Sequence, residues 1–137
     1  MSETHALTRV RGVLAKAAYE THLTFGRHEL VADEPSSAGG ADAGPTPFAL
    51  LLSGLIACTA ITLRMYAERK AWPLTGLTVD AAYHHDPAGA FIERTLIIEG
   101  DLDEAQRARM ADIAERTPVT LAVKGGVEIR THVKEAA

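Results

Sequence analysis

The sequence contains a single cysteine, Cys58, among its 137 residues. One cysteine cannot form an intrachain disulfide, and no secretory signal segment stands at the start of the chain. We therefore expect the reducing cytoplasm as the compartment.

A run of basic residues is also missing, as are internal repeats and low-complexity tracts. The formal net charge is −4, so a nucleic-acid partner is not expected. With 47% hydrophobic and 23% charged residues, the composition is that of an ordinary globular protein. We expect one domain over residues 1–137, burying roughly two-thirds of its unfolded surface.

Several catalytic signatures are absent. The sequence has no Gly-x-Ser-x-Gly elbow, and no Lys-Ser/Thr pair follows Gly39-Gly40 as a phosphate-binding loop requires. The densest group of metal-binding residue types is His84-His85-Asp86, but neighbouring residues on a strand point to opposite faces. We expect neither a metal nor another cofactor.

The stretch Gly44–Lys70 has no charged residue from Phe48 to Leu63. Thr46 can cap a helix whose first residue is Pro47, and Trp72-Pro73 ends it. A membrane span needs about 20 apolar residues, and this run is shorter and contains Ser, Gly and Thr. We expect no membrane insertion, but a helix buried on nearly all sides, inside the domain or at a subunit interface.

Cys58 lies in the middle of this helix. Helical spacing places four residues on its side, namely Leu51, Leu55, Thr62 and Met65. A reactive thiolate needs a nearby cation, a helix N-terminus or a metal, and the helix start is about three turns away. The residues alone leave two interpretations open: a small core residue, or a nucleophile activated by an arginine that the fold brings near.

The first third of the chain predicts three strands, at residues 8–18, 19–25 and 28–32, joined by short turns as an antiparallel meander. Residues 1–6 are expected to be a loose end. The irregular stretch Asp33–Gly44 then leads to the central helix. It is either a loop that shapes a binding site or a plain connector.

After the central helix, residues 77–84 and 91–99 predict a hairpin turning at Asp86–Gly89. A helix is predicted over Asp101–Arg116, with Asp101 and Glu104 as its capping box and Pro118 as its end. Its apolar stripe is predicted as Leu102, Ala105, Met110 and Ile113. Residues 119–123 form a short apolar run before a turn at 124–126, and 127–133 predict a last strand. Since helices and strands do not alternate regularly, the fold class is α+β.

Two long motifs resemble one known family. Residues 32–74 contain ADEP, GG, GPTPF, LLL, CTA, TLRMYAERK and WPL, and residues 92–119 contain IERT, GDLDEAQRARM, DIAER and PV. With the final Arg130-Thr131, they resemble the OsmC/Ohr family, in the branch of OsmC-like proteins. The resemblance implies antiparallel sheets wrapped around two central helices. It also implies an intertwined homodimer.

The resemblance further implies a thiol-dependent peroxidase that reduces organic hydroperoxides. Cys58 matches the peroxidatic cysteine, while the position of the second, resolving cysteine holds Thr117. The glutamate that helps to activate the thiol is replaced by Ala49, and Arg27 is our candidate for the activating arginine. A sulfenic acid on Cys58 would then need an external thiol reductant.

The resemblance and the two substituted positions leave three functions open. The first is a one-cysteine peroxidase of reduced activity that acts through Cys58 on a small organic hydroperoxide. The second is a non-catalytic homodimer that binds a small hydrophobic ligand in a pocket near Cys58. The third is a purely structural dimer with neither turnover nor ligand.

Overall fold

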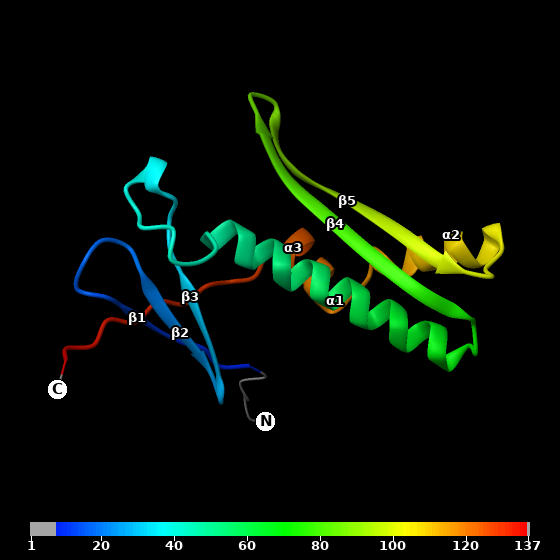
Figure 1. Ribbon diagram of the computed structural model, residues 1–137, viewed down its shortest axis with the longest axis horizontal. Coiled ribbons are helices and arrows are strands. Elements are labelled where there is room, and N and C mark those ends of the chain that lie inside the picture. Colours follow the sequence, from blue (N-terminus) through cyan, green and yellow to red (C-terminus); the bar gives the residue numbers. More distant parts are fainter. Residues whose placement is uncertain (1–7, 137) are drawn as a thin grey trace. The chain divides into compact units, whose positions relative to one another are not determined.

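The computed structural model describes residues 8–136, and it contains two compact units, Met1–Leu51 and Leu52–Ala137. The boundary falls within the first third of the long helix α1 (Pro47–Arg69). The expected loose end at residues 1–6 lies outside the described residues. Helices and antiparallel sheets occur together, which confirms the α+β class (Figure 1).

The first unit contains the predicted meander. β1 (Arg11–Leu14), β2 (Thr21–Phe25) and β3 (His28–Ala32) form one antiparallel sheet in that order. β1 is much shorter than the predicted strand over 8–18. The chain leaves the sheet after Leu14, where the Ala15 N–H donates to the Glu20 carbonyl oxygen at 2.8 Å.

A buried carboxylate fixes the irregular stretch after β3, which includes a short 3-10 helix, η1 (Ser36–Ala38). Asp33 is 2% exposed, and its oxygens accept hydrogen bonds from the N–H groups of Glu34, Ala41 and Ala43. The chain also passes so close to itself that a Cβ on Gly44 would lie 1.9 Å from a carbonyl oxygen. The stretch is therefore held in one conformation as it leads the chain into α1.

Helix α1 begins as predicted. The Thr46 hydroxyl accepts from the Ala49 N–H at 3.2 Å, and Pro47 occupies the first helical position. The single chain buries only part of this helix, so burial on nearly all sides inside the domain is wrong, while burial at a subunit interface stays a prediction. Buried side chains recur every fourth residue along one stripe, made of Leu55, Thr59, Leu63 and Ala67. Large apolar side chains elsewhere on the helix are exposed, namely Phe48, Leu51, Ile61 and Met65.

By length and composition alone, α1 would also be able to cross a membrane, with only 17% of its most apolar window buried. Core helices of soluble proteins pass the same test, so this is weak evidence for a span.

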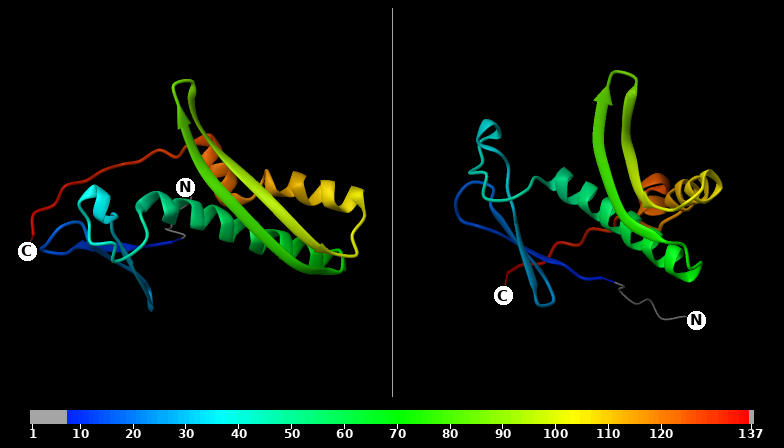
Figure 2. Two further views of the ribbon diagram at one scale, coloured as in Figure 1. Left: turned by 45° about the horizontal axis from the view of Figure 1, so that its top comes forward. Right: turned by 45° about the vertical axis from the view of Figure 1, so that its right-hand side comes forward.

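The second unit contains the predicted hairpin, although both strands are longer than expected. β4 (Leu74–Asp86) pairs antiparallel with β5 (Gly89–Gly100), and this pair forms the second sheet. At the turn, the Asp86 carboxylate accepts from the N–H groups of Ala88 and Gly89. The turn end of the hairpin projects beyond the helices of this unit (Figure 2).

Helix α2 (Glu104–Ala114) starts later than predicted. Its capping box is formed by Asp103 and Gln106, so the predicted pair Asp101 and Glu104 is wrong. Leu102 is buried just ahead of the helix, and its N–H bonds the Gly100 carbonyl, which delays the first helical turn.

The predicted stripe of α2 is partly right. Met110 is fully buried and Ile113 packs against the core, whereas Ala105 is exposed and Ala114 takes its place.

A third helix, α3 (Pro118–Gly125), replaces the predicted apolar run and turn. Pro118 does lie beyond α2, but it also occupies the first position of α3, where its missing N–H is not needed. The described part of the chain therefore has three α-helices rather than two. The strand predicted over 127–133 is wrong, since these residues pair with no other strand among those described.

The core of the second unit lies where α1, α2 and the open end of the hairpin meet. Its buried members come from all of these elements and the turns beside them, namely Leu63, Ala67, Leu74, Leu102, Met110 and Ala114. Trp72, Leu77, Leu96 and Ile98 pack around them. This core fixes β5 against α1 and α2, and β5 then carries polar residues toward α3.

Candidate active site

Cys58 lies in the middle of α1, in the second unit, as a free and half-buried thiol. Its sulfur lies 4.0 Å from the hydroxyl oxygen of Thr62, one helical turn further on, which is a weak contact. Cys58 borders the buried stripe of α1, because the next residue, Thr59, is fully buried. Cys58 thus lies beside buried residues, while part of its side chain stays exposed.

Two of the predicted site residues belong to the first unit. Ala49 lies in the first turn of α1, where its N–H completes the Thr46 cap. Arg27 lies in the exposed turn between β2 and β3. Its role as the activating arginine stays a prediction.

Thr117 occupies a structural position. It is 1% exposed and caps α3, since its hydroxyl oxygen accepts from the Thr120 N–H at 3.3 Å. The two hydroxyl oxygens of Thr117 and Thr120 lie 2.6 Å apart. A side chain at position 117 is therefore held at the start of α3 by two contacts with one residue.

Arg94 on β5 connects this position to the helix that carries the cysteine. Its side chain is only 12% exposed. Nη1 donates to the Thr59 hydroxyl oxygen at 3.0 Å and to that of Thr120 at 2.9 Å, while Nη2 donates to the Ala114 carbonyl oxygen at 2.8 Å. One guanidinium group thus binds α1, α3 and the C-terminal end of α2.

The hydrogen-bond directions in this cluster are consistent with one another. The Thr59 hydroxyl donates to the Leu55 carbonyl at 2.7 Å, which leaves its oxygen free to accept from Arg94. The Thr120 hydroxyl donates to the Ala114 carbonyl at 3.1 Å, so the proton between Thr117 and Thr120 comes from Thr117. We call these four residues, Thr59, Arg94, Thr117 and Thr120, the arginine–threonine cluster.

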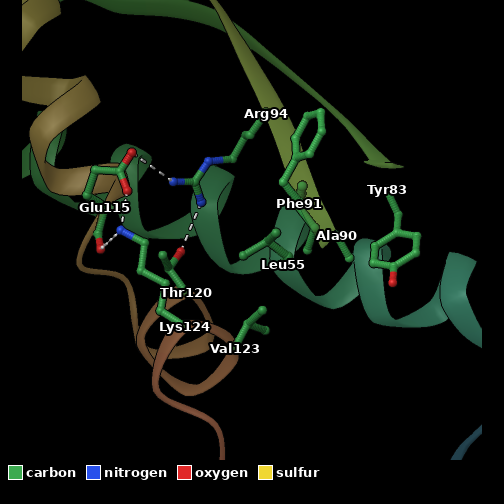
Figure 3. A pocket seen from close by; sticks show the side chains of 10 residues that line it. Leu55, Tyr83, Ala90, Phe91, Arg94, Glu115, Thr120, Val123 and Lys124 are labelled. Atoms are coloured by element: carbon green, nitrogen blue, oxygen red, sulfur yellow. Dashed lines mark hydrogen bonds and ion pairs between the residues drawn. The ribbon is translucent and has the colours of Figure 1, made fainter. Parts of the chain in front are cut away.

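A pocket of about 460 Å³ opens beside this cluster (Figure 3). Its apolar lining comes from α1, the hairpin and α3, and includes Leu55, Tyr83, Phe91, Ile92 and Val123. The polar lining residues are Arg94, Glu115, Thr120 and Lys124. Figure 3 shows them at one side of the pocket, with Arg94 between Glu115 and Thr120.

Glu115 stands between the two cations of the pocket. It accepts a hydrogen bond from Lys124 Nζ and lies 3.9 Å from Arg94 Nη2. The Lys124 hydrogen bond is the main cause that lowers the pKa of Glu115 below its ordinary value, against the opposing effect of burial. The charges of Lys124 and Arg94 add to this lowering.

The histidines of β4 are placed as surface residues. His84 stacks on Phe91 with 4.8 Å between ring centroids and lies 3.5 Å from a Glu93 oxygen. Residues 8–136 contain no group of three or more His, Cys, Asp or Glu residues that could hold a metal ion.

Arg94 was not among the candidate residues named from the sequence, although it lies within the IERT motif. Strand alternation could have found it, because Arg94 lies two residues from both Ile92 and Leu96, on the same face of β5. An arginine on the inward face of a strand needs buried acceptors. Those acceptors come from α1 and α3, so sequence spacing could not name them.

A family model described as OsmC-like protein matches residues 39–132, which is more than half of the chain. The chain belongs to the OsmC-like protein family. The matched segment contains Cys58 and the whole arginine–threonine cluster. Comparison with curated protein sequences gave no match.

Solved structures of OsmC-like proteins share the fold. An OsmC-like protein from Mycoplasma pneumoniae is 20% identical, with a TM-score of 0.77 over 90% of this chain and 91% of that one. An organic hydroperoxide resistance protein OsmC from Legionella pneumophila is 21% identical, with a TM-score of 0.64 over 92% and 95%. The organic hydroperoxide resistance protein OhrB of Bacillus subtilis is 23% identical, with a TM-score of 0.60 over 90% and 94%.

Proposed function

We propose that this OsmC-like protein is a one-cysteine thiol peroxidase of low activity, with Cys58 as the reacting residue and a small organic hydroperoxide as substrate. The observation that carries the proposal is a half-buried free thiol in the middle of α1, within the segment that matches the OsmC-like family. Two of the similar structures are named as organic hydroperoxide resistance proteins, which supports the substrate class.

The reaction would proceed in two stages. The Cys58 thiolate attacks the outer peroxide oxygen, an S–O bond forms, the O–O bond breaks, and the leaving alkoxide takes a proton to become an alcohol. An external thiol then attacks the resulting sulfenic acid, releasing water and forming a mixed disulfide, and a second thiol regenerates Cys58. One hydroperoxide and two thiols thus give one alcohol, one water and one disulfide.

Two substitutions in the family pattern explain why we expect low activity. Thr117 has a hydroxyl where the resemblance implies a second cysteine, so the chain has no second thiol to resolve its own sulfenic acid. Ala49 has no carboxylate to hold an activating arginine. The Cys58 sulfur contacts a neutral hydroxyl, that of Thr62, which does not stabilise a thiolate as a cation would.

A coupled assay with cumene hydroperoxide and a dithiol tests the proposal. We expect slow consumption by the natural protein and none by Cys58→Ser. Glu68→Gln is the matched control and should leave the consumption unchanged, because it alters an exposed side chain on the same helix and leaves the sulfur and its contact with Thr62. If Cys58→Ser consumes the hydroperoxide as well as the natural protein does, Cys58 is not the nucleophile.

The pocket favours a second candidate function, the binding of a small hydrophobic ligand without turnover. A volume of about 460 Å³ with a mostly apolar lining lies within the range of small-molecule sites. Under this function, a hydrophobic fluorescent probe should bind the Cys58→Ser variant as well as the natural protein. Phe91→Ala should weaken that binding, while consumption of hydroperoxide stays at background.

Both functions are proposed for a homodimer in the cytoplasm. The exposed apolar side chains of α1, among them Leu51, Ile61 and Met65, are 44–59% exposed in the single chain. A patch of this kind usually marks a contact surface. A second copy of the chain, packed on this face, would make α1 a core helix of the dimer rather than a membrane span.

A further inference from the structure

We infer that Arg94 is a positioning residue for Cys58: its guanidinium group fixes the helical turn that carries the cysteine relative to residue 117. The inference rests on the proposed function only in taking Cys58 as the reacting residue. In this role Arg94 acts through Thr59 and Thr120, and not directly on the sulfur or on a substrate.

The hydroxyl groups that Arg94 binds are buried. Thr59 is 0% exposed and Thr120 is 4% exposed, and each hydroxyl oxygen accepts a hydrogen bond from the same Arg94 nitrogen. Hydrogen bonds to a charged donor are stronger than neutral ones, and a buried donor left without its acceptor is costly. The spacing between α1 and α3 is therefore set by one rigid planar group.

The two threonines lie close in the chain to residues 58 and 117. Thr59 directly follows Cys58, so fixing its side chain fixes the turn of α1 on which the sulfur lies. Thr117 is the N-cap of the helix that contains Thr120, and the Leu121 N–H donates to the Thr117 carbonyl oxygen at 2.9 Å. Fixing Thr120 therefore fixes residue 117 through backbone contacts that do not need the Thr117 hydroxyl and that Thr117→Cys keeps. Arg94 thus connects position 58 with position 117 through one residue on each side.

A cysteine at position 117 turns this geometry into a measurable equilibrium. In Thr117→Cys, the two thiols can form a disulfide, losing two protons and two electrons that oxidised glutathione takes up to give two reduced molecules. The equilibrium constant reports the effective concentration of one thiol at the other. No hydroperoxide is involved, so the result does not depend on whether the natural protein is a peroxidase.

Arg107 provides the matched control. It also belongs to the second unit and donates three hydrogen bonds, to the carbonyl oxygens of Ile98, Gly100 and Leu102. Its acceptors are backbone groups at the turn between β5 and α2, and none lies on α1 or α3. Arg107→Met should destabilise the fold in a similar way without changing the relation of residues 58 and 117.

The experiment measures the disulfide constant of Thr117→Cys alone and combined with Arg94→Met, Arg94→Lys or Arg107→Met, with urea unfolding in parallel. We expect Arg94→Met to lower the constant about tenfold or more, as the loss of several hydrogen bonds implies, and Arg107→Met to leave it within about twofold. Arg94→Lys should remain low, because the lysine side chain ends one atom short of Nη1 and Nη2 and has one nitrogen in place of the two that bond the hydroxyls and the Ala114 carbonyl.

A second pair of variants leaves Arg94 in place. Thr59→Val removes one acceptor with little change in volume and should lower the constant, whereas Thr59→Ser keeps the hydroxyl and should largely preserve it. This pair decides the matter if Arg94→Met does not fold. The inference is overturned if Thr117→Cys forms no disulfide with Cys58, or if Arg107→Met lowers the disulfide constant as much as Arg94→Met does. It is also overturned if Arg94→Lys keeps the constant of Thr117→Cys alone, or if Thr59→Val and Thr59→Ser give the same constant.

Discussion

The hydroxyl oxygens of Thr117 and Thr120 lie 2.6 Å apart in a buried contact at the start of α3. Position 117 is the one at which the family resemblance implies a resolving cysteine. The threonine cannot form a disulfide, but it caps α3 and completes the arginine–threonine cluster. The position of the resolving cysteine that the resemblance implies thus holds a structural residue in this chain.

We predict that the double substitution Ala49→Glu with Thr117→Cys restores a dithiol cycle. The glutamate would supply the missing carboxylate, and the cysteine would supply the missing sulfur. After peroxide treatment, mass spectrometry should find a disulfide between residues 58 and 117. Ala49→Glu with Thr117→Ser is the control and should give none. Fast hydroperoxide consumption by the natural protein with a common dithiol would contradict the premise that these two residues are needed.

We predict that Met110→Ala reduces the free energy of unfolding by about 2–5 kcal/mol, because Met110 is fully buried in the core. Ile113 is only partly buried against the same core, so Ile113→Ala should cost less, though more than about 1 kcal/mol. Exposed Ala105 is the control, and Ala105→Ser should stay within about 0.5 kcal/mol. Urea unfolding checks all three. If Ile113→Ala lowers the free energy of unfolding by less than about 1 kcal/mol, Ile113 does not face the core.

We predict a specific pH dependence for Asp33. The hydrogen bonds from the N–H groups of Ala43, Glu34 and Ala41 outweigh burial and lower its pKa below the ordinary value of 3.8. The ionised carboxylate therefore stabilises the fold above pH 3.8, and this stability is lost as the pH falls through the lowered pKa.

The test for Asp33 compares the natural protein with Asp33→Asn across the pH range. The difference in their free energies of unfolding should be constant above about pH 5 and should shrink below 3.8. Glu34→Gln, at the next position, is the control for removing one carboxylate. A difference that grows toward low pH would contradict the assignment.

We predict a homodimer that depends on the exposed apolar face of α1. Light scattering should give twice the mass of the chain at micromolar concentration, and Met65→Glu should shift it toward the monomer, because the charge would be buried in the contact. Glu68→Gln, also on α1, is the control and should leave the dimer intact. A stable folded monomer of the natural protein under these conditions would count against the prediction.

Local signals in the sequence determined much of the fold. The caps and breakers around α1, the turn residues Asp86–Gly89 and the patterns of residues 19–25 and 28–32 predicted elements that the structure confirms, because each depends on neighbours in the chain. The family resemblance likewise came from contiguous motifs, which matched Cys58 to the peroxidatic position and Thr117 to the resolving position.

Tertiary structure decided the rest. Whether Asp101 or Asp103 caps α2 depended on the burial of Leu102, and whether Pro118 ends or begins a helix depended on what α3 could pack against. The hydrogen bonds of Arg94 depended on hydroxyls 35 and 26 residues away in the sequence, which only the packing of α1 and α3 beside β5 brings within hydrogen-bond distance. Hydrogen bonds are short-ranged, so a buried cation's partners follow from the folded arrangement and not from the order of residues.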